Sequence, residues 1–234
     1  MKYTYIVLFF ISSLLFSQNK SGIITYKQIQ AISEVDSTKF DADAFKIAMD
    51  MTKAINKLEF KLEYNSKYSK FSIVDKLEKD DANVGLMMAK SVFGSEVYYY
   101  SNKEKYFIRS SDNSQVKLKD SMTWSLTSET KDISGYTCYK ATSVDIFTSM
   151  NGIAKNDIVA WYCPKIPVNY APEKFNGLPG LVLELSIGNR TYVASEINFK
   201  KEEITIDFPK GKVITEQENS AITKAKLQEM LNNR

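Results

Sequence analysis

Alternation of apolar and polar residues dominates the chain and predicts β-strands. The clearest case is Leu58–Tyr64, where every second residue is apolar, as in a strand with one buried face. Short turn signals separate successive segments, which favours antiparallel pairing. We expect about ten strands, within residues 22–29, 58–64, 68–74, 96–100, 105–109, 116–118, 123–127, 133–144, 157–162, 181–187 and 191–199.

Two further segments carry apolar residues at helical spacing. Residues 41–55 present one apolar face, and Asp41 or Asp43 can cap the start of this helix. A C-terminal helix is expected at about residues 220–231. These patterns predict a mainly β (α+β) fold: a large curved antiparallel sheet or half-barrel with two or three covering helices. In architecture it is similar to the folds of periplasmic lipoprotein carriers.

Residues 81–93 have two interpretations. They contain several apolar residues, including the adjacent pair Met87 and Met88. One interpretation is a short helix packed on the sheet. The other is an apolar flap whose flexible methionines line a binding surface that can adapt to its ligand.

The first residues have the three parts of a secretory signal peptide. Met1–Tyr3 supplies a positive start, an apolar run of about 11 residues covers Ile6–Phe16, and the chain turns polar after Ser17. A membrane span needs roughly 20 residues, although an uncleaved anchor is the alternative. We expect cleavage of residues 1–17. The remaining single β-rich domain, residues 18–234, would lack a transmembrane anchor and be periplasmic or secreted, in an oxidising compartment.

The composition excludes several kinds of chemistry. The 234 residues include no histidine and 2 cysteines, and the formal net charge is +3. Without histidine there can be no Ser-His-Asp triad, His-ligated zinc or His-ligated haem, and two cysteines cannot hold an iron–sulfur cluster. Lysines are interspersed with acidic residues, so no basic face suggests nucleic-acid binding. We expect no cofactor, no metal and no nucleic-acid partner.

Recognisable motifs lie between Trp124 and Leu185. They are, in order, Gly-Tyr-Thr-Cys-Tyr-Lys-Ala (135–141), Ala-Trp-Tyr (160–162) and Lys-Phe-Asn-Gly-Leu-Pro-Gly-Leu-Val-Leu-Glu-Leu (174–185). These motifs resemble those of the GLPGLI family, which is named for the last of them and is found in Gram-negative envelopes. The resemblance implies an exported protein without an established activity, and it supplies no catalytic residue. Ala171, Cys163 and residues 147–156 depart from the family pattern.

The glycine-containing motif has a structural and a functional interpretation. Gly177 and Gly180 permit a positive φ or a close backbone approach, and Leu178 and Leu181 can fill an apolar hole. The structural interpretation is a rigid turn that leads into a central strand and packs under Trp161. The functional interpretation is a rim that contacts a ligand or partner. Candidate binding residues are Trp161, Phe175, Leu178, Pro179, Leu181, Met87 and Met88.

The two cysteines fall on consecutive predicted strands. If these strands pair around a loop at residues 146–156, Cys138 lies opposite Cys163. In an exported protein this arrangement favours a disulfide. The alternative is a pair of buried free thiols. The sequence lacks a Cys-x-x-Cys motif, so a redox-catalytic role is not expected.

Three functions remain open. The first is a non-enzymatic protein that binds a lipid or another apolar molecule in the concavity of the sheet, which requires a large apolar cavity. The second is an interaction module for an outer-membrane transporter or secretion complex, with a filled interior and an exposed apolar patch around Leu178–Leu181. The third is a carboxylate-based hydrolase, with two acids facing each other in a cleft.

Overall fold

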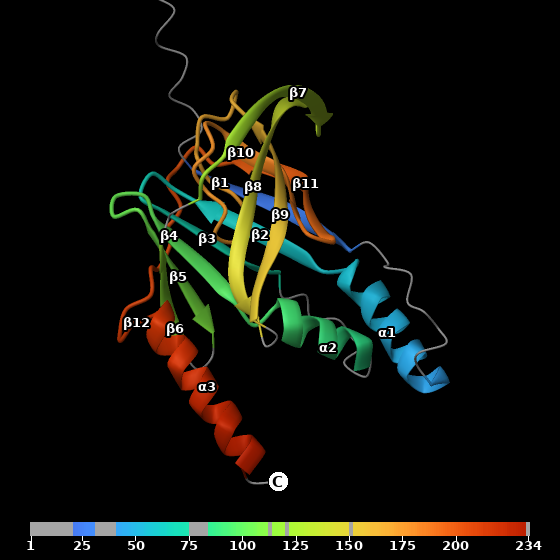
Figure 1. Ribbon diagram of the computed structural model, residues 1–234. Coiled ribbons are helices and arrows are strands. Elements are labelled where there is room, and N and C mark those ends of the chain that lie inside the picture. Colours follow the sequence, from blue (N-terminus) through green and yellow to red (C-terminus); the bar gives the residue numbers. More distant parts are fainter. Residues whose placement is uncertain are drawn as a thin grey trace, which may run out of the picture.

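The computed structural model describes residues 21–30, 41–74, 84–111, 114–119, 122–149 and 152–232. The expected signal peptide lies outside this part of the chain. Twelve strands and three helices form within it (Figure 1). They are β1 (Gly22–Gln30), α1 (Ala42–Ile55), β2 (Glu59–Tyr64), β3 (Tyr68–Ile73), α2 (Val84–Phe93), β4 (Val97–Ser101), β5 (Tyr106–Ser111), β6 (Ser114–Lys119), β7 (Ser125–Ile133), β8 (Tyr136–Ser149), β9 (Gly152–Cys163), β10 (Leu181–Ile187), β11 (Arg190–Phe199), β12 (Ile214–Thr215) and α3 (Glu216–Asn232).

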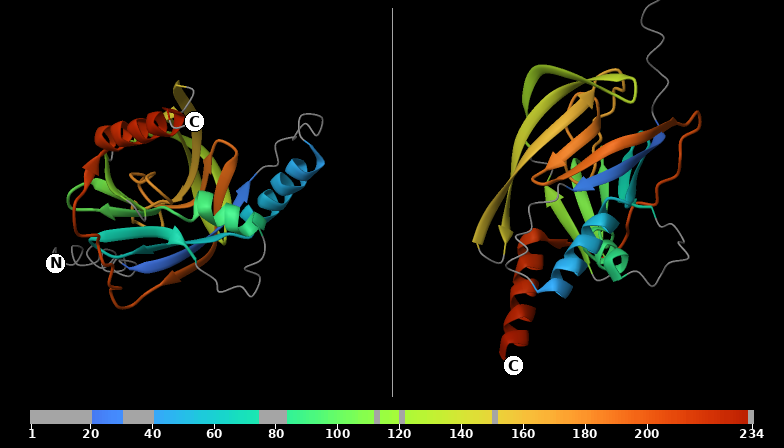
Figure 2. Two further views of the ribbon diagram at one scale, coloured as in Figure 1. Left: turned by 90° about the horizontal axis from the view of Figure 1, so that it is seen from below. Right: turned by 90° about the vertical axis from the view of Figure 1, so that its right-hand side faces the viewer.

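All twelve strands belong to one sheet, in the order β12-β6-β5-β4-β3-β2-β1-β11-β10-β9-β8-β7. Neighbouring strands are antiparallel, except that β12 runs parallel to β6. Seen from below, the sheet curls almost into a ring (Figure 2, left). The predicted fold, a large curved and mainly antiparallel sheet with helices, is confirmed.

The alternation in the sequence explains which side chains the sheet buries. In β2, Phe60, Leu62 and Tyr64 are buried, whereas the charged residues between them are partly exposed. The expected turn between β10 and β11 is present, with Gly188 at φ +58, which glycine adopts readily. β1 pairs with β2 on one side and with β11 on the other, so the first strand lies in the middle of the sheet.

The helices α1 and α2 pack against each other at one end of the curled sheet (Figure 1). The side chain of Asp41 caps α1 by accepting a hydrogen bond from the backbone N–H of Ala44 at 2.7 Å. The two helices approach closely at Gly85, where a Cβ atom would lie 2.9 Å from the backbone of Asp50. The segment expected to form either a helix or a flap therefore contains the helix α2.

The C-terminal helix α3 begins earlier than the expected start at about residue 220. It follows β12 directly, and Thr215 and Glu218 form a capping box: each backbone N–H donates to the other residue's side chain, at 2.7 and 3.2 Å. From there α3 leads away from the sheet (Figure 1). Among the described residues, no helix is both long and apolar enough to cross a membrane.

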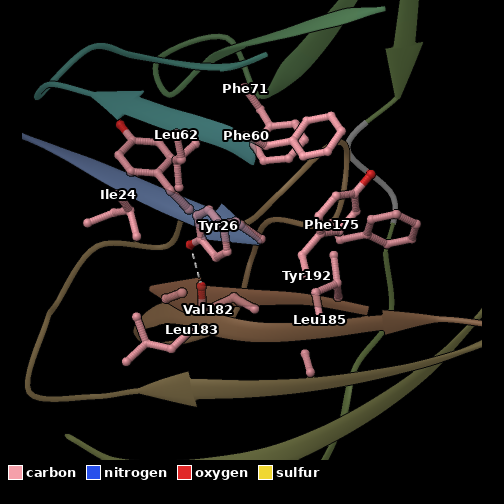
Figure 3. Close-up of a cluster of buried hydrophobic side chains, with 14 of the residues drawn as sticks. Ile24, Tyr26, Phe60, Leu62, Phe71, Phe175, Val182, Leu183, Leu185 and Tyr192 are labelled. Carbon is pink, nitrogen blue, oxygen red and sulfur yellow. Dashed lines mark hydrogen bonds between the residues drawn. The ribbon is translucent and has the colours of Figure 1, made fainter. Parts of the chain in front are cut away.

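The segment between β9 and β10, residues 164–180, runs inside the curled sheet (Figure 2, left). We call this segment the interior loop. Its residue Phe175 is buried among aromatic side chains of the sheet, such as Tyr192 (Figure 3). Nearby, the hydroxyl of Tyr26 donates a hydrogen bond to the carbonyl oxygen of Val182 at 2.6 Å. The concavity of the sheet is thus packed with side chains from the chain itself.

The hairpin of β8 and β9 is longer than expected. Its register places Tyr139 opposite Tyr162, which is the antiparallel register predicted from the cysteines. The expected loop at residues 146–156 is wrong, because both strands continue through most of it. Ser, Thr, Gly and Asn are frequent in this stretch and obscure the alternation of apolar residues. The two-residue strand β12 was also not expected, since so short a strand leaves no pattern.

Candidate functional site

The two ends of the interior loop lie close together, and this close approach depends on one glycine. Leu181 pairs with Cys163, so the loop leaves and rejoins the sheet at neighbouring positions. A Cβ atom on Gly180 would lie 2.3 Å from the carbonyl oxygen of Cys163, which leaves no space for any side chain. Gly177 has φ +106, a conformation that other residues rarely adopt. The close approach and the positive φ expected of this motif are both present.

Hydrogen bonds fix the rest of the interior loop. The side-chain oxygen of Asn176 accepts a bond from the backbone N–H of Ala171 at 2.7 Å, and its carbonyl accepts one from the indole of Trp124 at 3.1 Å. The hydroxyl of Tyr170 donates to the carbonyl of Asn65 at 3.0 Å. The tryptophan that binds this loop is therefore Trp124.

A buried carboxylate lies at the centre of the interior loop. Glu173 is 7% exposed and has a left-handed backbone, with φ +54, which costs a residue other than glycine about 1 kcal/mol or more. Its oxygens lie 2.9 and 3.0 Å from Nη2 of Arg190, and its Oε1 accepts a hydrogen bond from the hydroxyl of Tyr192 at 2.8 Å. These contacts connect the loop to β11.

A second acidic residue lies near Glu173 and Arg190. Glu96 accepts a hydrogen bond from the hydroxyl of Tyr98 at 2.7 Å and lies 3.4 Å from Nε of Arg109. Glu96, Tyr98, Glu173 and Arg190 line a small cavity of about 60 Å³, together with aromatic residues of the sheet and the end of α2. We call Glu96, Tyr98, Glu173, Arg190 and Tyr192 the polar cluster.

Burial shifts the pKa values of Glu173 and Tyr192 in the polar cluster. Removal from water raises the pKa of Glu173 above its ordinary value, although the guanidinium of Arg190 acts in the opposite direction. Burial and the nearby Glu173 raise the pKa of Tyr192 well above its ordinary value. Tyr192 is therefore a neutral hydrogen-bond donor at neutral pH.

The raised pKa of Glu173 predicts a pH dependence of stability. The folded protein binds a proton at Glu173 more readily than the unfolded chain, so this residue favours folding most below the ordinary glutamate pKa, near 4.3. That contribution is lost as the pH rises through the folded-state pKa. On acidification from pH 7 towards pH 5, we expect the wild type to gain stability relative to Glu173→Gln. Urea unfolding of both proteins across this range measures the difference, and parallel curves would contradict the prediction.

The polar cluster offers limited chemistry. Two acids line one cavity, as a carboxylate hydrolase requires, but each is already bound to an arginine and a tyrosine. A cavity of about 60 Å³ holds a few water molecules rather than a glycan or peptide. Among the described residues, no group of three or more acids and cysteines could hold a metal ion. The arrangement best fits a structural link between the loop and the sheet.

Most of the predicted binding residues near the interior loop are buried. Phe175, Leu178 and Leu181 pack in the interior, whereas Pro179 is exposed. Trp161 is on β9 and half-buried, with the ammonium of Lys131 5.5 Å from its ring. The exposed apolar patch expected around Leu178–Leu181 is therefore not present at these two leucines.

The two predicted methionines are on the surface. Met87 and Met88 in α2 are 61% and 41% exposed, and Val84 and Val92 on the same helix are also exposed. The four residues have the spacing of one helical face. We call them the α2 face. Met87 and Met88 thus lie apart from the buried candidates of the interior loop.

Both cysteines are buried, and the structure holds them as free thiols. They flank the paired residues Tyr139 and Tyr162, and the Cys138 thiol donates a hydrogen bond to the carbonyl oxygen of Tyr136 at 3.5 Å. The interaction between the two neighbouring thiols lowers the pKa of Cys163 and raises that of Cys138, and backbone N–H groups also favour the Cys163 thiolate. The disulfide between them stays a prediction for the exported protein.

If the disulfide forms, it has two measurable effects. Protein purified from the periplasm is expected to be lighter by two hydrogen atoms than the same protein after reduction. The bridge is expected to contribute about 3 kcal/mol to the free energy of unfolding, because it closes a loop of moderate length. Mass spectrometry and urea unfolding with and without reductant test both effects. The variant Cys163→Ser is the control, since it must show neither effect.

Sequence reasoning did not identify the polar cluster. Glu173 lies in a loop expected to fill an apolar hole, and Arg190 lies in a stretch expected only as a turn. Their side chains meet because the interior loop returns to β11 inside the sheet. The available signal was Glu173, the single acidic residue of the interior loop.

The fold and the site together define a class of protein: a curled antiparallel sheet filled by one of its own loops. A family model described as "Protein of unknown function (Porph_ging)" matches residues 148–184, which include β9, the interior loop and the start of β10. A comparison with curated proteins gives no match.

Two solved structures are similar to this fold. One, "Structure of PNGF-II in P21 space group", shares 21% identity, with a TM-score of 0.52, over 86% of this chain and 32% of that chain. The other, "Structure of PNGF-II in C2 space group", shares 20% identity, with a TM-score of 0.50, over 84% of this chain and 31% of that chain. At this identity the likeness concerns the fold alone, and this chain corresponds to about a third of the PNGF-II chain.

Proposed function

We propose that this chain is an exported, non-enzymatic interaction module of the GLPGLI family, located in the periplasm or secreted. One observation carries the proposal: the interior loop occupies the concavity in which an apolar ligand was expected. Phe175 and Leu178 are buried there, and the cavity beside Glu173 measures about 60 Å³. A drug-sized ligand needs roughly 300–1,000 Å³.

Exposed apolar side chains support an interaction function. Met87 and Met88 lie on the α2 face, and Ile146 and Ile153 lie near the end of the β8–β9 hairpin. Clustered apolar residues at the surface commonly mark binding sites for other proteins. A partner such as an outer-membrane transporter or secretion complex would bind these surfaces.

The family and the location rest on the sequence. Gly177 and Gly180 of the family motif each have a physical role in the interior loop. The family model of unknown function covers the same region. The signal-peptide pattern of residues 1–17 supports export.

Binding of an apolar ligand stays a second candidate because of one surface pocket. This pocket has a volume of about 300 Å³ and is lined by Thr137, Tyr139, Tyr162, Pro164 and Lys165. Its two tyrosines could contact a lipid or another apolar small molecule. The pocket lies outside the filled interior, so this candidate would bind its ligand in a different place from the one first expected.

Native mass spectrometry with lipid extraction, on protein purified from the periplasm, separates the two candidates. An interaction module is expected to give a ligand-free mass. A photo-reactive residue at Met87 or Ile146 is then expected to form a discrete cross-linked product in intact cells, whereas one at the exposed Ile29 of β1 is not. A stoichiometric apolar molecule that is lost in the variant Tyr139→Ala would overturn the proposal in favour of ligand binding.

A further inference from the structure

The ends of β8 and β9 extend beyond the rest of the sheet. β7 stops pairing with β8 at Thr142, and β10 stops pairing with β9 at Ile158. The two strands nevertheless continue to pair with each other to the end of the hairpin. We call residues 143–149 and 152–157 the arm. It projects away from the curled sheet (Figure 2, right).

One face of the arm carries exposed apolar side chains, and Lys155 and Asp157 of β9 lie on the same face. Val144 and Ile146 share this face, and so does Ile153, because it is two residues from Lys155, which pairs with Ile146. Ile146 and Ile153 are 70% and 84% exposed. A two-stranded hairpin is marginally stable in water by itself, and exposed isoleucines add nothing to its stability. Another segment covering this face would bury them.

Among the described residues, the outer edge of β8 has no strand neighbour along the arm. The hydroxyl of Ser143 donates a hydrogen bond of 2.6 Å to the carbonyl of Thr123, where the chain leaves β8 before β7 begins. Beyond this point, within the described part of the chain, residues 144–149 have a strand neighbour on the β9 side alone. Such an edge presents backbone N–H and C=O groups that can pair with an added strand.

A pocket opens beside this edge. It has a volume of about 610 Å³, and its lining includes Met122, Thr142, Val144, Asp157 and Val159. Its lining comes from the segment that leads into β7 and from neighbouring positions of β8 and β9. Strand-addition sites combine a free edge with pockets for alternate side chains of the added strand. The arm has both features.

We propose that the arm binds an extended segment of a partner protein by β-strand addition along β8, residues 144–149. Apolar and polar residues alternate along the segment. Its β-branched or aromatic residues lie opposite Val144 and Ile146, and one of their side chains enters the pocket. Its polar residues lie on the same face as Asp145. The proposal rests on the proposed interaction function and specifies the chemistry of the partner. Asp145, on the opposite face, is already paired with Lys174 at 2.8 Å, whereas Lys155 and Asp157 share the face of Val144 and Ile146.

The test is an NMR titration of the full exported chain with a peptide of alternating valine and threonine flanked by lysines. The peptide is expected to shift the amides of residues 144–149 and slow their hydrogen exchange. The variant Ile146→Lys is expected to weaken binding about tenfold or more, because it places a charge opposite the apolar residues of the peptide. Ile29→Lys, at an exposed position of β1, is the matched control and is expected to leave binding unchanged.

Several results would overturn strand addition at the arm. They are the absence of shifts at residues 144–149, shifts confined to the α2 face, and equal weakening by both lysine variants. Shifts that depend on protein concentration without peptide would instead show that a second copy of the chain occupies the edge. These outcomes test strand addition alone and leave the proposed interaction function untouched. The interaction function fails if an apolar ligand co-purifies with the protein. It stands, without strand addition at the arm, if cross-links form from Met87 alone.

Discussion

Replacement of Gly180 by alanine is expected to destabilise the protein by about 3 kcal/mol or more. The new Cβ atom would lie 2.3 Å from the carbonyl oxygen of Cys163 and 2.5 Å from its carbonyl carbon, and both are backbone atoms that cannot rotate away. The ends of the interior loop would have to separate, which would withdraw Phe175 and Leu178 from the interior. Urea unfolding followed by tryptophan fluorescence measures the loss.

Gly135→Ala is the control for Gly180→Ala. Gly135 lies in the turn between β7 and β8 at φ +82, and a Cβ atom there would have no neighbour within 4 Å. This variant carries a conformational cost of about 1–2 kcal/mol without an atomic overlap. Equal unfolding midpoints for the two variants would show that the contact with Cys163 is unimportant.

Replacement of Arg190 by methionine is expected to cost about 3–5 kcal/mol, because Glu173 would then be a buried acid without its cation. The hydroxyl of Tyr192 would be its one remaining hydrogen-bond donor within the polar cluster. The cost is expected to be smaller at acidic pH, where the carboxyl becomes neutral. Thermal and urea unfolding at pH 5 and pH 7 measure both effects.

Two further proteins test the reason for this cost. Glu173→Gln combined with Arg190→Met removes both charges and is expected to be more stable than Arg190→Met alone. Lys53→Met breaks an exposed ion pair with Asp50, with Lys53 69% exposed, and is expected to change stability by less than about 0.5 kcal/mol. A double variant as unstable as Arg190→Met would show that lost packing, rather than the unpaired charge, causes the effect.

Strands such as β2 could be predicted because they have one buried face. Phe60, Leu62 and Tyr64 show this alternation directly, and the register of Cys138 and Cys163 followed from placing two strands around one turn. The arm escaped prediction because its apolar residues face solvent, so burial did not select a clear pattern there. Ile153 is the extreme case, at 84% exposed.

The interior loop could be predicted in part. Gly177, Gly180, Leu178 and Leu181 indicated a tight turn with apolar anchors, and the structure places both leucines in the interior. The polar cluster could not be predicted, because neither the depth of the loop nor the curl of the sheet is encoded by any local pattern. Only the complete fold brings Glu173 to Arg190.

The central position of β1 has a consequence for the order of folding. β1 lies between β2 and β11, and the hydroxyl of Tyr26 on β1 bonds to Val182, 156 residues further along the chain. The middle of the sheet therefore cannot close until most of the chain is available, and contacts between such distant residues make folding slow. During synthesis one edge of β1 stays unpaired until β11 is made. The sheet of the nascent chain therefore cannot be completed before the last third of the chain is present.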